Sequence, residues 1–314
     1  FRSAMIVDSS ALTEQVVIDV LASAFDSAGQ RCSALRVLCL QDEIADHTLK
    51  MLRGAMAECR MGNPGRLTTD IGPVIDSEAK ANIERHIQTM RSKGRQVFQA
   101  VRENSEDARE WQSGTFVAPT LIELDDFAEL QKEVFGPVLH VVRYNRNQLP
   151  ELIEQINASG YGLTLGVHTR IDETIAQVTG SAQVGNLYVN RNMVGAVVGV
   201  QPFGGEGLSG TGPKAGGPLY LYRLLANRPE SALAVTLARQ DAEYPVDAQL
   251  KAALTQPLNA LREWAANRPE LQALCTQYGE LAQAGTQRLL PGPTGERNTW
   301  TLLPRERVLC IADD

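Results

Sequence analysis

Apolar and polar residues recur along the chain with two periods, one typical of helices and the other of buried strands. From about Leu12 to Ala28, the apolar positions fall on one helical face: Val16, Val17, Val20, Leu21, Ala24 and Phe25. Gly29 follows them, and a glycine commonly ends a helix at this place. A short connection then leads into a continuous apolar run from Leu35 to Leu40. The pattern therefore predicts a helix, a turn and a buried strand.

Helical and strand-like segments continue to alternate as far as about residue 190. The pattern predicts helices near 43–60, 77–93, 149–159 and 171–179. It predicts strands near 4–7, 96–101, 115–123, 137–143, 162–168 and 186–190. Such alternation is typical of an α/β fold with a largely parallel sheet.

The pattern changes after the last of these strands. Residues 192–218 contain nine glycines in 27 positions, which predicts a long ordered loop or a binding surface. Helical periodicity returns over 248–266 and 271–284, and 307–313 resembles the first strand of another α/β unit. We therefore expect three regions: an α/β domain over 1–227, a helical linker region over 228–296, and the start of a further α/β domain over 297–314.

Composition and charge narrow the classes of function. Hydrophobic residues make up 43% of the chain and charged residues 21%, as in an ordinary globular protein. The net charge of −7 disfavours nucleic-acid binding through a broad basic face. No apolar run approaches the roughly 18 residues of a membrane span. The four histidines are scattered singly, so the sequence predicts no metal site.

The five cysteines, which are Cys32, Cys39, Cys59, Cys275 and Cys310, contain no C-x-x-C pair. This odd number favours free thiols in a reducing cytoplasm. Cys32 is the candidate nucleophile, because it follows Arg31 on the connection between a helix and a strand, where a thiolate can face a cleft. The alternative role for Cys32 is that of a small buried hydrophobic residue. For the other four cysteines, the apolar surroundings favour this second role.

Two further segments carry candidate chemistry. Gly205–Gly210 matches G-x-G-x-x-G literally, but neither flank has the strand and helix of a dinucleotide-binding loop, so we reject that reading. In the second segment, Glu133 and Phe135 can point the same way if the backbone is extended. A carboxylate can accept the two hydroxyls of a ribose, and an aromatic ring can pack on a heterocycle. The alternative is a surface glutamate and a core phenylalanine.

Three motifs in this order, Gly29–Cys32, Glu133–Pro137 and Gln201–Gly205, resemble the aldehyde dehydrogenase superfamily. The phrases at 70–74, 161–164 and 209–217 resemble its L-glutamate γ-semialdehyde (pyrroline-5-carboxylate) dehydrogenases. The whole chain resembles the C-terminal part of bacterial bifunctional flavoenzymes that oxidise proline to glutamate. The implied fold is the catalytic half of an aldehyde dehydrogenase followed by a helical tail.

The resemblance implies roles for single residues. Cys32 matches the nucleophile that forms a thioester, and its backbone N–H matches half of the oxyanion hole. Glu133 matches the residue that binds the nicotinamide ribose of NAD, and Phe135 one that packs near the nicotinamide. Gly195 and Ala196 match the loop that anchors the substrate carboxylate, and Phe203 an aromatic on the aliphatic stem of the substrate.

The resemblance also assigns several functions to sequence outside this chain. These are the NAD-binding half, the water-activating glutamate, the oxyanion asparagine, the FAD-dependent proline dehydrogenase, and any DNA-binding or membrane-associating parts. The implied protein is cytoplasmic, with peripheral association at the inner membrane, and homo-oligomeric. We expect the 314-residue chain alone to be inactive. The alternatives are a non-catalytic structural piece and an aldehyde dehydrogenase of other specificity.

Overall fold

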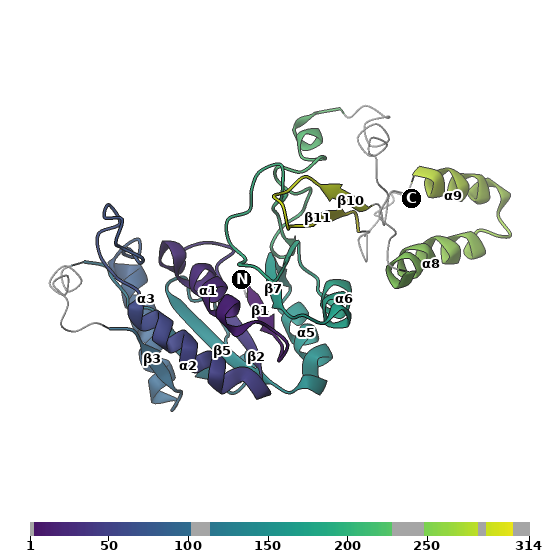
Figure 1. Ribbon diagram of the computed structural model, residues 1–314. Helices are drawn as coiled ribbons and strands as arrows, with labels where there is room; N and C mark the ends of the chain where they lie inside the picture. The colour runs from purple at the N-terminus through teal and green to yellow at the C-terminus, as the bar shows by residue number, and fades with distance from the viewer. Residues whose placement is uncertain (1–2, 102–113, 228–247, 282–286, 304–314) are drawn as a thin grey trace. The chain divides into compact units, whose positions relative to one another are not determined.

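The computed structural model describes residues 3–101, 114–227, 248–281 and 287–303 (Figure 1). The chain divides into two compact units. The first unit comprises 1–195 and 204–212, and the second comprises 196–203 and 213–314. Cys310 and the strand expected at 307–313 lie outside the described residues.

The first unit is built on a seven-stranded sheet in the order β3-β4-β5-β2-β1-β7-β8. Its strands are β1 (Ala4–Val7), β2 (Val37–Gln41), β3 (Val97–Gln99), β4 (Thr120–Leu124), β5 (Val138–Tyr144), β7 (Thr164–His168) and β8 (Asn186–Val189). All neighbouring strands are parallel except β3 and β4, which are antiparallel. The α/β fold with a largely parallel sheet is therefore confirmed.

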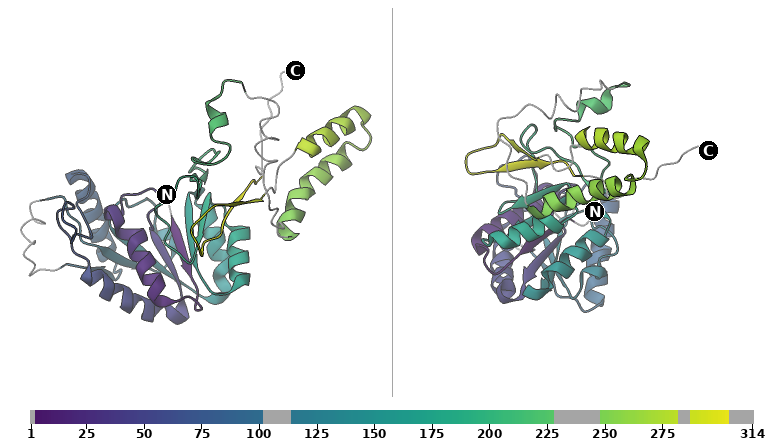
Figure 2. Two further views of the ribbon diagram at one scale, coloured as in Figure 1. Left: turned by 45° about the horizontal axis from the view of Figure 1, so that its top comes forward. Right: turned by 90° about the vertical axis from the view of Figure 1, so that its right-hand side faces the viewer.

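Helices cover both faces of this sheet (Figures 1 and 2). The helices of the first unit are α1 (Thr13–Phe25), α2 (Asp42–Glu58), α3 (Ser77–Ser92), α5 (Leu149–Ala158) and α6 (Asp172–Ser181). Because parallel crossovers are right-handed, α1 and α2 lie on one face, while α5 and α6 lie on the other. The central strands are consequently buried on both sides, and β1 is wholly inaccessible to solvent.

The helix expected over 12–28 ends three residues early, at Phe25. Asp26–Gly29 instead forms a tight turn in which Ser27 and Ala28 have left-handed backbone conformations (φ 57° and 53°). Left-handed residues cannot continue a right-handed helix. Gly29, which was expected to end the helix, instead ends this turn with φ 66°.

The glycine-rich segment over 192–218 is mostly loop. Its regular element in the first unit is β9 (Glu206–Gly207), which pairs antiparallel with β6 (Tyr161–Gly162). The segment expected as one strand over 162–168 is thus divided between β6 and β7. Neither β9 nor its surroundings form a strand followed by a helix start, in agreement with the rejection of a dinucleotide-binding loop at Gly205–Gly210.

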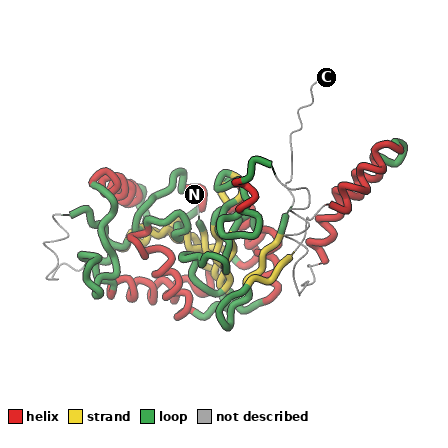
Figure 3. Tube along the Cα trace, turned by 90° about the horizontal axis from the view of Figure 1, so that it is seen from above, coloured by secondary structure: helices red, strands yellow, loops and turns green. Residues whose placement is uncertain are grey.

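The described elements of the second unit are α8 (Ala248–Trp264), α9 (Pro269–Leu281), the strands β10 (Gln287–Leu290) and β11 (Asn298–Thr301), and a short turn at Leu221–Leu224. The two helices predicted in this region are confirmed. The strands β10 and β11 form an antiparallel hairpin. Figure 3 shows the elements of both units coloured by type.

Candidate active site

A strained turn holds the residues that precede Cys32 against another loop. A Cβ atom on Gly29 would lie 2.2 Å from the carbonyl oxygen of Gly136, closer than any real contact. Only glycine allows this approach, and it also tolerates the left-handed φ of 66°. The turn is therefore shaped by its contact with the segment that contains Glu133 and Phe135.

Cys32 is exposed, whereas Cys39 and Cys275 are buried and Cys59 is half-buried. Burial raises the pKa of the Cys39 thiol to about 12, which makes it inert as a nucleophile. The backbone N–H of Cys32 donates no hydrogen bond to the described part of the chain. The structure thus exposes this residue to solvent.

The side chain of Gln30 fixes the approach to Cys32. Its Nε2 donates to the carbonyl oxygen of Pro73 at 3.3 Å, and its Oε1 accepts from the Ile75 N–H at 2.8 Å. These two hydrogen bonds join Gln30 to residues 73 and 75, at the end of the segment 70–74 that was singled out in the sequence.

Arg36 joins the Cys32 loop to the Glu133 segment, and its side chain is only 3% exposed. Its Nε donates to Oε1 of Glu133 at 3.3 Å. Its two terminal nitrogens donate to the carbonyl oxygens of Arg31 and Gly136, each at 3.2 Å. A planar guanidinium with several fixed donors suits such a junction better than an ammonium group.

The same guanidinium lies over the ring of Phe135, 4.7 Å from its centroid. Glu133 and Phe135 therefore share one partner, as expected if both side chains point the same way. Phe135 is 45% exposed, so it is not the core phenylalanine of the alternative reading. Burial lowers the pKa of Arg36, while the charges of Glu133 and Cys32 oppose this effect. Cys32, Glu133 and Phe135 thus lie around one buried cation.

Two histidines lie behind this junction. The N–H of His140 donates to the carbonyl oxygen of Arg36 at 2.9 Å, and its Nδ1 lies 3.2 Å from that oxygen. Its Nε2 is 2.8 Å from Nε2 of His86. Burial lowers the pKa of His140 to about 3 and also lowers the pKa of His86. Both rings are therefore neutral at physiological pH.

The three expected substrate-binding residues are divided between the units. Gly195 closes the first unit with φ 73°, and a Cβ atom built there meets nothing within 4 Å. Ala196 and Phe203 belong to the second unit. There Phe203 exchanges two backbone hydrogen bonds with Ala215, at 3.0 and 2.9 Å.

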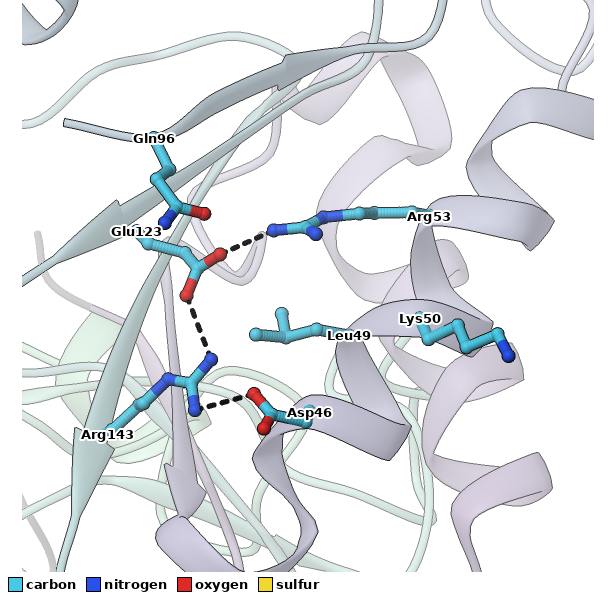
Figure 4. A pocket seen from close by; sticks show the side chains of 7 residues that line it. All are labelled: Asp46, Leu49, Lys50, Arg53, Gln96, Glu123 and Arg143. Carbon is cyan, nitrogen blue, oxygen red and sulfur yellow. Dashed lines mark hydrogen bonds and ion pairs between the residues drawn. The ribbon is translucent and has the colours of Figure 1, made fainter.

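A surface pocket of about 350 Å³ lies elsewhere on the first unit (Figure 4). It is lined by Asp46, Leu49, Lys50, Arg53, Gln96, Glu123 and Arg143. In this pocket Glu123 bridges Arg53 and Arg143, and Arg143 also pairs with Asp46 at 2.8 Å. Glu123 and Arg143 stand towards the carboxyl ends of their strands, whereas Cys32 and Glu133 precede the amino ends of β2 and β5. The pocket is thus separate from the candidate active site.

Among the described residues, no three His, Cys, Asp or Glu side chains are arranged to hold a metal ion. Within the same ranges, no helix combines the length and apolar character of a membrane span.

Arg36 was not predicted as a site residue from the sequence. A charged residue directly before a buried strand was the available signal, because a buried arginine requires an acidic partner. That partner, Glu133, is 97 positions away in sequence, so the pattern of residues alone could not identify it.

Residues 2–226 match the family model described as the aldehyde dehydrogenase family. The chain therefore belongs to the aldehyde dehydrogenase family. It is 98% identical over 312 residues to the bifunctional protein PutA of Escherichia coli (strain K12). This alignment covers 99% of this chain and 24% of that protein. It is 35% identical over 222 residues to 1-pyrroline-5-carboxylate dehydrogenase of Geobacillus kaustophilus, covering 70% of this chain and 41% of that enzyme.

Solved structures show the same relationship. A crystal structure of bifunctional proline utilization A (PutA) aligns with a TM-score of 0.66 and 53% identity, over 71% of this chain and 22% of that one. A 1-pyrroline-5-carboxylate dehydrogenase from Thermus with bound NAD aligns with a TM-score of 0.62 and 35% identity, over 71% of this chain and 42% of that one. The chain spans about a quarter of the length of the curated PutA relatives it matches.

Proposed function

We propose that this chain supplies the nucleophile for oxidation of L-glutamate γ-semialdehyde to L-glutamate with NAD, the second step of proline catabolism. The observation that supports the proposal most is the position of the exposed Cys32. Arg36 donates to the carbonyl oxygen of the residue before it and also contacts Glu133 and Phe135. The names of the relatives supply the substrate, because they include 1-pyrroline-5-carboxylate dehydrogenases.

In the proposed reaction, the Cys32 thiolate adds to the aldehyde carbon and forms a thiohemiacetal. The backbone N–H of Cys32 donates to the oxyanion that develops on the former carbonyl oxygen. Loss of hydride from the same carbon leaves a thioester on Cys32. Water then adds to the thioester, the thiolate departs, and glutamate is released.

The residues around Arg36 fit NAD. When bound, NAD supplies the acceptor for the hydride. The Glu133 carboxylate would accept hydrogen bonds from the nicotinamide ribose, and the exposed Phe135 ring would pack near the nicotinamide. Arg36 holds both side chains, so neither has to be ordered anew on binding.

Gly195 and Ala196 are the proposed anchor for the α-carboxylate of the substrate, and Phe203 is the proposed contact for its aliphatic stem. Backbone N–H groups in a glycine-containing turn form a concave site that suits an anion. The left-handed, exposed Gly195 is consistent with such a turn.

We place the chain within a longer cytoplasmic, homo-oligomeric bifunctional enzyme. In this proposal, FAD serves a proline dehydrogenase domain outside the chain, and DNA or membrane association also depends on other segments. The isolated chain is expected to be inactive, because the family resemblance assigns the NAD-binding half and the water-activating glutamate to sequence outside it.

The proposed function is tested with a full-length bifunctional protein that carries this sequence. NADH formation is followed with glutamate semialdehyde and with propanal, an aldehyde that lacks the α-carboxylate. The proposal predicts a much higher kcat/KM for glutamate semialdehyde. Equal values for the two aldehydes would favour an aldehyde dehydrogenase of other specificity, and no turnover of either would favour a structural role.

A further inference from the structure

The segment that leads from β8 to Gly195 is held by polar side chains of α1. Nε2 of Gln15 donates to the carbonyl oxygen of Asn190 at 2.6 Å. The Met193 N–H donates to Oγ of Ser23 at 3.1 Å. Both ends of the four-residue stretch 190–193 are thus bonded to the same helix.

The Asp19 carboxylate stands between Gln15 and Ser23 on α1 and faces the same stretch. The nearby backbone of Asn192 stabilises its charged form, although burial raises the pKa of Asp19 overall. Its Oδ2 also lies 3.5 Å from Nε2 of the buried His168, at the end of β7. The stretch 190–193 is therefore bonded to α1 at both ends and lies beside Asp19 in its middle. A loop whose backbone groups are bonded in this way has few alternative conformations.

The three residues of α1 form one line. Gln15, Asp19 and Ser23 are spaced four apart, so they lie above one another on one face of the helix. Because α1 follows the carboxyl end of β1 and precedes the amino end of β2, it runs antiparallel to the strands. The stretch 190–193 starts at the carboxyl end of β8 and follows this line to the opposite edge of the sheet. That edge also carries Cys32, just before β2.

Ser23 joins the two loops directly. Its hydroxyl accepts from the Met193 N–H, and its carbonyl oxygen accepts from the Leu35 N–H at 2.9 Å. Met193 stands two residues before Gly195, and Leu35 stands three residues after Cys32. All three bonded residues are buried: Ser23 is 1% exposed, and Leu35 and Met193 are inaccessible. Buried hydrogen bonds of this kind are costly to break.

We infer that the Gln15–Asp19–Ser23 line is a positioning element that sets the distance between Cys32 and the Gly195 turn. This inference rests on the proposed function, in which Cys32 attacks the aldehyde while the Gly195 turn holds the carboxylate at the other end of the same substrate. A misplacement of about 1 Å between two such groups can lower the rate about 100-fold. An aldehyde without the carboxylate does not contact the Gly195 turn and escapes this penalty.

The test uses Ser23→Ala and Asp19→Ala in the full-length bifunctional protein, with kcat/KM measured for glutamate semialdehyde and propanal. Each variant is expected to lose about tenfold or more with glutamate semialdehyde and less than threefold with propanal. Asp19→Asn should restore most of the loss, because an amide oxygen keeps an acceptor beside the backbone of Asn192. Glu14→Ala, on an exposed position of the same helix, should leave both values unchanged.

Equal losses with both aldehydes, or no loss with either, would overturn the inference. Thermal melting identifies a variant that fails to fold. If Ser23→Ala does not fold, the kcat/KM values of the Asp19 variants decide, because Asp19 is less buried than Ser23. The proposed function fails separately, because it requires Cys32 whatever the α1 variants do. A Cys32→Ala variant that retains turnover would therefore reject the proposed function, whereas α1 variants with unchanged selectivity would reject only the positioning role.

Discussion

Arg36 and Glu133 form a buried ion pair, with Nε of the arginine 3.3 Å from Oε1 of the glutamate. Through Arg36, the pair connects the loop that contains Cys32, the proposed nucleophile, with the segment proposed to bind NAD. Because the Arg36 side chain is 3% exposed and the Glu133 side chain 19%, removing either partner leaves a charge poorly compensated.

A double-mutant cycle measures this coupling. Arg36→Leu alone is expected to destabilise the fold by about 3 kcal/mol, since it removes the ion pair with Glu133 and the donors to the carbonyl oxygens of Arg31 and Gly136. Glu133→Gln should raise the KM for NAD, and in combination with Arg36→Leu the losses should be less than additive by about 1–3 kcal/mol. Urea unfolding and NAD titration of the four proteins provide the measurements. Strictly additive effects would mean that the pair contributes neither stability nor order.

Gly29→Ala should damage both stability and activity. The new Cβ atom would lie 2.2 Å from the carbonyl oxygen of Gly136, and the residue would keep a left-handed backbone. Gly94→Ala is the matched control, because Gly94 has φ 78° and no neighbour within 4 Å of a Cβ atom. The control should lose about 1 kcal/mol from backbone strain alone. Gly29→Ala should lose clearly more and should also lower kcat; similar losses for both would show that the contact with Gly136 is unimportant.

Gly195→Val tests the proposed carboxylate anchor. A side chain at Gly195 has room in the structure, but it would stand where the substrate carboxylate is proposed to approach. We expect kcat/KM to fall far more for glutamate semialdehyde than for propanal. Gly199→Val provides the control, because Gly199 also has a positive φ of 80° and open space around it. Parallel losses with both aldehydes would make the Gly195 turn a structural support.

Acid should destabilise the first unit through His140. Its pKa falls from the ordinary 6.5 to about 3 on folding, because the ring is buried beside His86. The unfolded chain therefore binds more protons than the folded one between these values, and stability is lost as pH falls below about 6.5. From about pH 7.5 to about pH 5, this group accounts for about 2 kcal/mol.

Replacement of His140 by Gln should reduce that pH dependence of the urea midpoint, although it also changes the stability at neutral pH. His47→Gln, on an exposed position of α2, is the control for replacing a histidine by glutamine. An identical acid response in the His140→Gln variant and the unmodified protein would reject this assignment.

The sequence predicted most elements of the first unit because their apolar residues follow the helix and strand periods closely. It placed the end of α1 wrongly, because Ser27 and Ala28 adopt left-handed conformations. Their turn packs closely against Gly136, which lies far away in the sequence. Local periodicity contains no information about such a contact.

The roles of the candidate site residues stay predictions. Cys32, Glu133 and Phe135 were singled out by residue type and motif. In the structure, Arg36 contacts Glu133 and Phe135 and donates to the carbonyl oxygen of Arg31, the residue before Cys32. The polar line on α1 was overlooked because the apolar face of that helix dominates its pattern. Asp19 and Ser23 were not recognisable as a site from their own segment, because the backbone of Asn192 and Met193 that lies beside them is about 170 positions away in the sequence.

The most direct test of the account is the effect of Cys32→Ala on NADH formation from glutamate semialdehyde by the full-length bifunctional protein. Cys59→Ala is the matched control, because Cys59 is half-buried just after α2 and its Sγ donates to the carbonyl oxygen of Ala55. We predict that Cys32→Ala lowers kcat/KM by at least about 10⁴-fold, while proline oxidation and the Cys59→Ala variant retain normal activity. Semialdehyde oxidation at an undiminished rate in Cys32→Ala would contradict the assignment of Cys32 as the nucleophile.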